Sequence, residues 1–173
     1  ALEHFEKSLR IYITIYGENH SDVANEYNNI GDSYYEKKDY DKALEYYNKA
    51  LPIQIANLGE NHKDIAFRQN KIGLAYYRME NYGMALEHFE KSLRIYITIY
   101  GENHSKVATE YNNIGETYYK KGDYQKALEY YDKALEIRKS VFGEDHPNTV
   151  KTQEKIAEIE AKLKEQQENP SNE

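Results

Sequence analysis

Four histidines recur at a constant interval along the chain and are the first candidates for chemistry, because imidazole binds metals and transfers protons. They are His20, His62, His104 and His146. With one histidine per structural repeat, neighbouring imidazoles would be about 10 Å apart, the packing distance of helices. That separation is too long for a shared ion, so we expect these side chains to pack against or cap the connectors. His4 and His88, which are two such intervals apart, are expected on a helix exterior.

The residue types and their spacing do not support a cysteine-based site, a phosphate-binding loop or an acid–base catalytic site. The chain has no cysteine, which excludes disulfides, thiolate zinc sites and cysteine nucleophiles. The Gly-Glu-Asn-His connectors lack the Gly-Lys-Ser/Thr ending of a phosphate loop, and no strand is expected before them. Carboxylates recur as parts of solvated faces, and no spacing brings together a nucleophile, a base and an orienting group. We therefore predict no enzymatic activity, no metal and no cofactor.

Composition narrows the classes of partner. The net charge of -7 over 173 residues argues against nucleic acid, because phosphate binding needs clustered lysine and arginine. No apolar stretch approaches the roughly 20 residues that span a bilayer, and no cleavable signal segment is present. We expect a cytoplasmic protein with no nucleic-acid or membrane partner. Ala1 already lies inside a helical pattern, so we expect the chain to be part of a longer protein.

The elements that position these residues follow the same 42-residue interval. The interval is kept by small residues: Gly17, Gly59, Gly101 and Gly143, and Ala1, Ala43, Ala85 and Ala127. Residues 1–21 and 85–105 are identical, which indicates that two repeats were copied together. Apolar residues at steps of three and four predict two helices in each repeat, from about 21 to 38 and from about 40 to 58 in the first complete one. Asp39 can cap the second helix, Gly59 can close it, and Pro52 inside it predicts a kink.

This periodicity predicts an all-α chain of about eight helices in antiparallel pairs. A single repeat array is expected over residues 1–167, followed by a flexible tail at 168–173. The array divides into a half repeat at 1–16, full repeats at 17–58, 59–100 and 101–142, and a capping helix within 143–167.

The repeat resembles the tetratricopeptide repeat, in which an aromatic, Leu-Gly and Tyr on one helix precede Ala, an aromatic and Ala on the next. The matching residues are Tyr27, Ile30, Gly31, Tyr34, Ala43, Tyr47 and Ala50, and again Tyr111, Ile114, Gly115, Tyr118, Ala127, Tyr131 and Ala134. The middle repeat departs at Gln69 and Ser92, which replace the first aromatic and the last alanine. The repeat length and the Gly-Glu-Asp-His-Pro connector at 143–147 are similar to kinesin light chain repeats, although the other three connectors lack the proline.

The resemblance implies a right-handed superhelical α-solenoid that acts as a protein–protein interaction scaffold. Glycines on the first helices would let paired helices approach closely, with tyrosines filling the space beside them. These residues are Gly31, Gly73 and Gly115, and Tyr34, Tyr76 and Tyr118.

In this family the first helices line the concave side, so the resemblance also implies a ligand surface. Its positions in the first complete repeat are Asn25, Asn28, Asp32, Tyr35 and Glu36. In the middle repeat they are Phe67, Asn70, Leu74, Tyr77 and Arg78, and in the third Thr109, Asn112, Glu116, Tyr119 and Lys120. Their charges are mixed, so the basic cluster that grips a terminal carboxylate is not expected.

Within this surface, Asn28, Asn70 and Asn112 form one ladder and Tyr35, Tyr77 and Tyr119 another. Carboxamides carry donors and an acceptor for a peptide backbone, and tyrosines add flat contact area. We hypothesise that the groove binds an extended peptide or a short helix of a protein partner. The alternative is structural, because duplication alone repeats every residue: the asparagines could bond a neighbouring helix and the tyrosines could cover the wall.

A second hypothesis is self-association through the helix at 1–16. It has an apolar face with no covering partner before it, formed by Leu2, Phe5, Leu9, Tyr12, Ile13 and Tyr16. Because an uncovered apolar face favours association, two copies could pair there as a homodimer, or the missing helix of the longer protein could cover the face.

Overall fold

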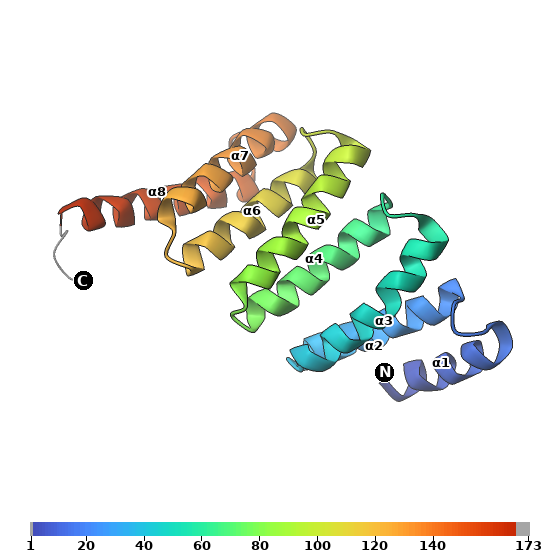
Figure 1. Cartoon of the computed structure of the whole chain (residues 1–173). Coiled ribbons are helices and arrows are strands. Elements are labelled where there is room, and N and C mark those ends of the chain that lie inside the picture. The colour runs from blue at the N-terminus through green and yellow to red at the C-terminus, as the bar shows by residue number, and fades with distance from the viewer. Residues whose placement is uncertain (1, 169–173) are drawn as a thin grey trace. The chain divides into compact units, whose positions relative to one another are not determined.

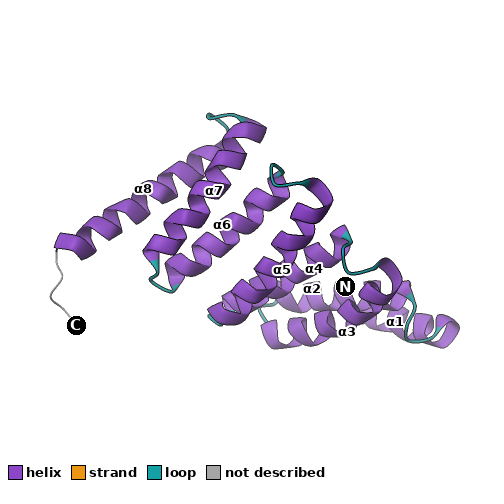
Figure 2. Cartoon of the chain, turned by 45° about the horizontal axis from the view of Figure 1, so that its top comes forward, coloured by secondary structure: helices purple, strands orange, loops and turns teal. Residues whose placement is uncertain are grey.

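The computed structural model describes residues 2–168, and these residues form eight helices and no strand (Figure 1). The helices are α1 (Leu2–Tyr16), α2 (Ser21–Glu36), α3 (Tyr40–Leu58), α4 (Lys63–Arg78), α5 (Tyr82–Tyr100), α6 (Ser105–Lys120), α7 (Tyr124–Phe142) and α8 (Pro147–Glu168). Short loops join them (Figure 2). The predicted all-α class and the alternation of first and second helices are therefore confirmed. The flexible tail was expected at 168–173; Glu168 is instead the last residue of α8, and 169–173 lie outside the described residues.

Two compact units make up the chain, Ala1–Ile95 and Tyr96–Glu173, with the boundary inside α5. We call them unit 1 and unit 2 and describe each by itself. In unit 1, α2 packs on α3 and α3 on α4, while α1 packs on α2. In unit 2, α6 packs on α7 and α7 on α8. Neighbours in sequence thus supply the packing, as in a repeat array.

The recurring histidines cap the first helix of each pair. Each Nδ1 accepts a hydrogen bond from the backbone N–H two residues later, at 3.2 Å; the histidines are His20, His62, His104 and His146. Three of the rings also stack on the aromatic residue four positions earlier, at centroid distances of 4.4, 4.2 and 4.5 Å. The expectation that these histidines cap the connectors is confirmed, and the reason is local, because the first amides of a helix need acceptors.

The second helices begin with side-chain caps, as predicted for Asp39 and repeated at the same position of the next two pairs. Asp39, Asn81 and Asp123 accept from the backbone N–H three residues later, at 3.2–3.3 Å. The residue before each cap is left-handed, with φ of 63° at Lys38 and 60° at Glu80. The third such turn has Gly122, which adopts this conformation without the steric cost that a Cβ brings. Helix α3 continues through the exposed Pro52 to Leu58.

Close approach of paired helices depends on one glycine in each pair. A Cβ on Gly31 would lie 2.6 Å from the ring of Tyr47, and the same contact joins Gly73 to Phe89 and Gly115 to Tyr131 at 2.8–2.9 Å. The aromatic that covers each glycine therefore comes from the second helix. The first-helix tyrosines expected to fill this space stack instead on Tyr46, His88 and Tyr130, with centroids 5.5–5.7 Å apart.

The middle repeat replaces an aromatic pair with a polar one. Tyr27 lies against Tyr46, and Tyr111 against Tyr130, with ring centroids 6.1–6.2 Å apart. At these two positions the middle repeat has Gln69 and His88, both buried, whose Oε1 and Nδ1 are 2.6 Å apart. The expectation that His88 faces a helix exterior is wrong, because the second helix packs this position against the first helix of its own pair. The loss of the aromatic at Gln69 is matched by the change at His88.

Candidate functional site

A polar pocket of about 230 Å³ opens in unit 1 between the first helices α2 and α4. Its lining residues are Asn25, Asn28, Asn29, Gln54, Asp64, Phe67 and Arg68. Phe67 is 42% exposed, whereas Asn28, Gln54 and Arg68 are nearly buried. The pocket therefore combines an accessible apolar ring with polar groups that the fold holds in fixed positions.

Charged groups surround this pocket on one side. Asp32 accepts a hydrogen bond from the hydroxyl of Tyr47 at 2.6 Å, and its Oδ1 lies 3.6 Å from Arg68 Nη1 and 3.4 Å from Lys71 Nζ. Burial and the hydrogen bond to Asp32 raise the pKa of Tyr47. Burial lowers the pKa of Arg68, whose guanidinium lies 4.7 Å from the centre of the Tyr47 ring.

Unit 2 has a pocket of about 340 Å³ at the equivalent place, between α6 and α8. It is lined by Asn112, Glu116, Tyr131, Arg138, Asn148, Lys151 and Lys155. Four lining positions recur in the two pockets at a separation of two repeat lengths: 28 and 112, 54 and 138, 64 and 148, 67 and 151. The same site is thus present twice, with asparagine at 28 and 112 and different side chains at the other three pairs of positions.

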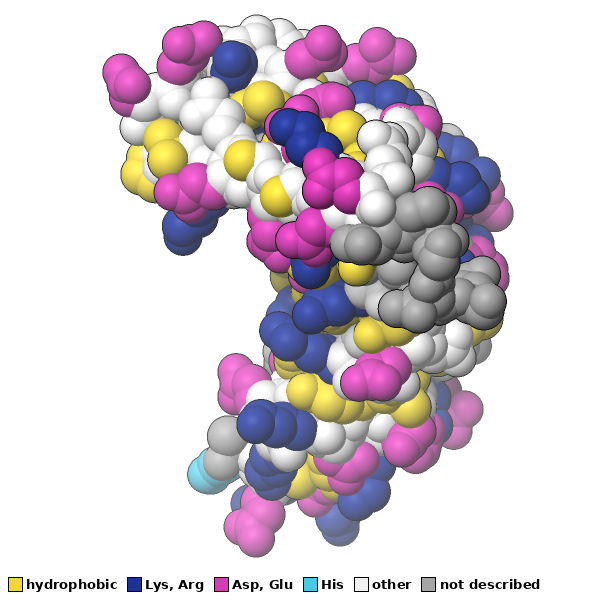
Figure 3. All heavy atoms as spheres, turned by 90° about the vertical axis from the view of Figure 1, so that its left-hand side faces the viewer, with side chains coloured by type: hydrophobic (Ala, Val, Ile, Leu, Met, Phe, Trp, Pro, Cys, Tyr) yellow, Lys and Arg dark blue, Asp and Glu magenta, His cyan; other side chains and the backbone are white. Residues whose placement is uncertain are grey.

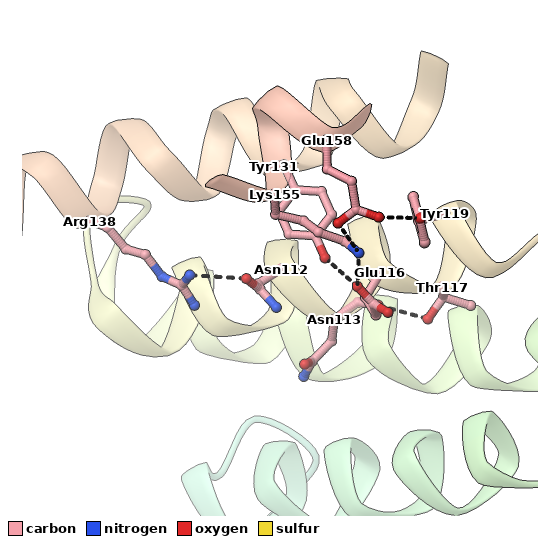
Figure 4. A network of polar contacts seen from close by, with 9 residues as sticks. All are labelled: Asn112, Asn113, Glu116, Thr117, Tyr119, Tyr131, Arg138, Lys155 and Glu158. Carbon is pink, nitrogen blue, oxygen red and sulfur yellow. Dashed lines mark hydrogen bonds and ion pairs between the residues drawn. The ribbon is translucent and has the colours of Figure 1, made fainter. Parts of the chain in front are cut away.

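Many polar side chains of the unit 2 pocket are hydrogen-bonded to one another (Figure 4). Arg138 Nη1 donates to Asn112 Oδ1 at 3.0 Å, to the carbonyl of Asn148 at 3.3 Å, and also to Thr152 Oγ1. Glu116 accepts from the hydroxyl of Tyr131 at 2.6 Å.

Helix α8 adds a lysine and a glutamate to this network. The ammonium of Lys155 lies 3.7 Å from Glu116, 3.1 Å from Glu158 and 3.7 Å from the centre of the Tyr119 ring. The hydroxyl of Tyr119 donates to Glu158, which raises the pKa of Tyr119 to about 12. These contacts tie α8 to α6 beside the pocket.

The structure places only part of the predicted ligand surface in these pockets. Asn25, Asn28 and Phe67 line the first, and Asn112 and Glu116 line the second. The remaining predicted positions do not line either pocket: Asp32, Tyr35, Glu36, Asn70, Leu74, Tyr77, Arg78, Thr109, Tyr119 and Lys120.

The two ladders have structural contacts of their own. Tyr35, Tyr77 and Tyr119 each lie against the tyrosine five residues later, at centroid distances of 5.3–5.8 Å, and so cover the turn between paired helices. Asn112 bonds Arg138 of the neighbouring helix. The structural alternative is therefore present in the fold for the tyrosine ladder and for Asn112, whereas Asn28 Oδ1 has no hydrogen-bond partner in the chain.

Sequence reasoning missed several lining residues because it considered first helices alone. Gln54 and Arg138 come from the ends of second helices, and Lys151 and Lys155 from the helix treated only as a cap. Arg138, Lys151 and Lys155 bring three basic side chains to the unit 2 pocket, of which Arg138 is hydrogen-bonded to Asn112 and Lys155 lies beside Glu116 and Glu158. Counting two repeat lengths onward from the predicted Phe67 would have pointed to Lys151.

Elsewhere on the surface, acidic and basic side chains are interspersed, as Figure 3 shows for one face. Within residues 2–168, no group of three histidine, aspartate or glutamate side chains is close enough to hold a metal ion. No helix among these residues combines the length and apolar character needed to cross a bilayer.

Comparisons with solved structures identify similar folds. BtubC (BKLC) from P. vanneervenii has 23% identity and a TM-score of 0.79; the alignment covers 90% of this chain and 62% of BtubC. A putative kinesin light chain from Podosopora anserina with nearly identical TPR-like repeats has 18% identity and a TM-score of 0.81, over 96% of this chain and 79% of that chain. Apo RapI has 26% identity and a TM-score of 0.75, over 92% and 57%. The chain thus spans less than two thirds of BtubC and of RapI.

Sequence comparison identifies the family of the repeats. No curated protein matches the chain at a significant level. The profile of the tetratricopeptide repeat matches residues 1–56, 22–98, 64–140 and 106–168, and these overlapping segments cover nearly the whole chain. The chain therefore belongs to the tetratricopeptide repeat family.

Proposed function

We propose that this chain is a non-catalytic scaffold whose first helices bind an extended peptide or a short helix from a partner protein. The observation that carries the proposal is the recurrence of one pocket, between successive first helices, in both units. Each pocket has an asparagine at the same position, Asn28 or Asn112, beside an exposed side chain, Phe67 or Lys151. A peptide laid along such helices meets amide groups for its backbone and separate contacts for its side chains.

The two pockets favour different side chains of such a peptide. In unit 1 the exposed Phe67 offers an apolar contact. In unit 2 three basic side chains outnumber the single carboxylate of Glu116, which favours an acidic group. The fold is shared with RapI and with the N-terminal domain of stress-induced protein-1 from C. elegans. The latter is 20% identical with a TM-score of 0.61, over 81% of this chain and 96% of that one. That the partner of this chain is a peptide or helix of another protein is our inference. The cytoplasmic location stays a prediction.

Selection from a displayed peptide library tests the proposal without a known partner. Enriched peptides should bind the wild-type chain and lose at least about tenfold in affinity to the variant Asn25→Ala/Phe67→Ala, which removes two exposed pocket residues. The variant Asn48→Ala/Leu58→Ala is the matched control, because it removes an exposed amide and an exposed apolar side chain outside the pockets. Equal affinity for both variants, or no enrichment at all, would count against a peptide-binding groove.

Self-association is a second candidate because of a difference between identical sequences. Residues 2–16 repeat as 86–100, yet Leu86, Phe89 and Leu93 are buried in α5, whereas α1 has no buried residue. The face of α1 that includes Leu2, Phe5, Leu9 and Tyr12 is therefore partly exposed where its copy in α5 is buried, whereas Tyr16 and its copy Tyr100 are both exposed.

Sedimentation over a wide concentration range tests this candidate. We expect a dimer that dissociates on dilution, and a monomer at every concentration for Phe5→Glu. A wild-type chain that is monomeric throughout the range would reject the candidate. Because Phe5 lies outside both pockets, this variant leaves peptide binding unchanged.

A further inference from the structure

The unit 1 pocket holds an unusual number of unpartnered polar atoms. Asn28 Oδ1, Gln54 Oε1 and both Nε and Nη1 of Arg68 are buried without a hydrogen-bond partner. The carboxylate of Asp32, 3.6 Å from Nη1, neutralises the arginine from beyond hydrogen-bond distance. Asn28 and Arg68 are each 5% exposed and Gln54 is 8% exposed, and all three line the cavity. Since buried polar groups in proteins are nearly always paired, these atoms call for a partner outside the chain.

The duplicated pocket in unit 2 is an internal comparison. At the positions of Gln54 and Arg68 it has Arg138 and Thr152, two repeat lengths later. Arg138 donates to both Thr152 and Asn112, the counterpart of Asn28. The pocket arginine thus comes from the first helix in unit 1, as Arg68, and from the second helix in unit 2, as Arg138. From the second helix it donates to Asn112, whereas the equivalent Asn28 has no partner for its Oδ1.

The unpartnered atoms define the chemistry of an occupant. Two carbonyl oxygens need N–H donors, while two N–H groups of Arg68 need an acceptor oxygen. A primary carboxamide supplies both, because it has two N–H bonds and a carbonyl with two lone pairs. A main-chain amide has only one N–H, and a carboxylate has none and would face the two carbonyl oxygens as well as Asp64.

Space and surroundings agree with such an occupant. The cavity of about 230 Å³ is several times the roughly 30 Å³ that one water molecule takes in the liquid. Phe67, 42% exposed, provides an apolar wall for the methylene groups that precede the amide.

We propose that the unit 1 pocket recognises the primary carboxamide of an asparagine or glutamine side chain in the bound peptide. This specificity rests on the proposed peptide-binding function, and it distinguishes the two pockets: unit 1 selects a neutral amide, whereas in unit 2 Arg138 already pairs the equivalent asparagine, Asn112. Recognition of this kind discriminates strongly, because an analogue that lacks the N–H groups leaves the buried carbonyls unpaired.

Titration with a small amide isolates this site from the rest of a peptide. The probe is propionamide, followed through the Nε–H resonance of Arg68 by NMR. We expect a saturable shift, with binding at least about tenfold weaker for N,N-dimethylpropionamide, which keeps the carbonyl and loses both N–H groups, and for propionate. Three compounds with equal effect would mean that the cavity holds water and no specific ligand, and would overturn the inference.

The variant Gln54→Arg/Arg68→Thr installs the arginine and threonine that unit 2 has at these two positions and is expected to abolish propionamide binding. The NMR spectrum of the rest of the chain and circular dichroism report whether it folds, and the comparison of ligands on the wild-type chain stands if it does not. Undiminished binding by a folded variant would also overturn the inference.

Peptides selected on the wild-type chain separate the inference from the broader function. Selected peptides could show no enrichment of asparagine or glutamine and bind the Gln54→Arg/Arg68→Thr variant as well as the wild-type chain. That result would refute the amide specificity and leave the peptide-binding function intact. Propionamide binding without any enriched peptide would support the amide site and remove the peptide-binding function.

Discussion

The buried pair of Gln69 and His88 predicts a middle repeat that is sensitive to acid. His88 is 9% exposed, and burial, with a smaller contribution from Lys91, lowers the pKa of His88 from 6.5 to about 4. Between these values the unfolded chain binds more protons than the folded one. The stability that depends on neutral His88 is therefore fully present above about pH 6.5 and is lost as the pH falls toward about 4.

The magnitude follows from the size of the pKa difference. Each pKa unit corresponds to about 1.4 kcal/mol, so the complete loss is about 3 kcal/mol, of which roughly 2 kcal/mol is lost by about pH 5. Urea denaturation followed by circular dichroism, at about pH 7.5 and about pH 5, measures the change in the free energy of unfolding.

The matched control is Gln69→Tyr/His88→Tyr, which installs the tyrosine pair that the other complete repeats have at these positions. All other ionisable groups of the chain remain, so the two pH dependences differ mainly through His88. We expect the wild-type chain to lose about 2 kcal/mol more than this variant between the two pH values. Equal losses, or an NMR titration of His88 with a midpoint near its ordinary pKa, would refute the reasoning.

Single substitutions test whether Gln69 and His88 act as a pair. His88→Tyr leaves the buried amide of Gln69 without its partner and should cost about 1–3 kcal/mol, which the added Gln69→Tyr change should recover. A double variant no more stable than the single one would show that the two positions are independent.

The remaining predictions concern the backbone, and denaturation midpoints check each of them. Gly31→Ala places a Cβ 2.6 Å from the ring of Tyr47 and should destabilise by about 1–3 kcal/mol, whereas Gly83→Ala meets no atom closer than 3.9 Å and should stabilise by up to about 1 kcal/mol; shifts of the same sign would contradict this. Lys38→Gly relieves a φ of 63° and should stabilise by about 1 kcal/mol, so a loss would contradict left-handed strain there. Pro52→Arg restores a backbone donor inside α3 and should stabilise by up to about 3 kcal/mol; an unchanged midpoint would mean that the helix tolerates the proline without cost.

What the sequence by itself determined is local or periodic. The helices, the cap at Asp39 and the glycines at the close contacts between paired helices follow from spacing, because a helix start needs an acceptor within a few residues and a close helix pair needs a missing Cβ. The ring that covers each glycine did not follow from spacing, since it comes from the second helix. The identity of residues 1–21 and 85–105 likewise revealed duplication without any coordinates.

What only the tertiary structure decided is which side chains of different helices meet. Gln54, Arg68 and Arg138 become site residues because the end of a second helix lies beside the next first helix, a contact that no spacing within one helix encodes. The same packing buries His88 against Gln69, although its copy His4 in an identical sequence is exposed. Burial and partnership belong to the neighbours of a residue in space, so identical segments acquire different properties.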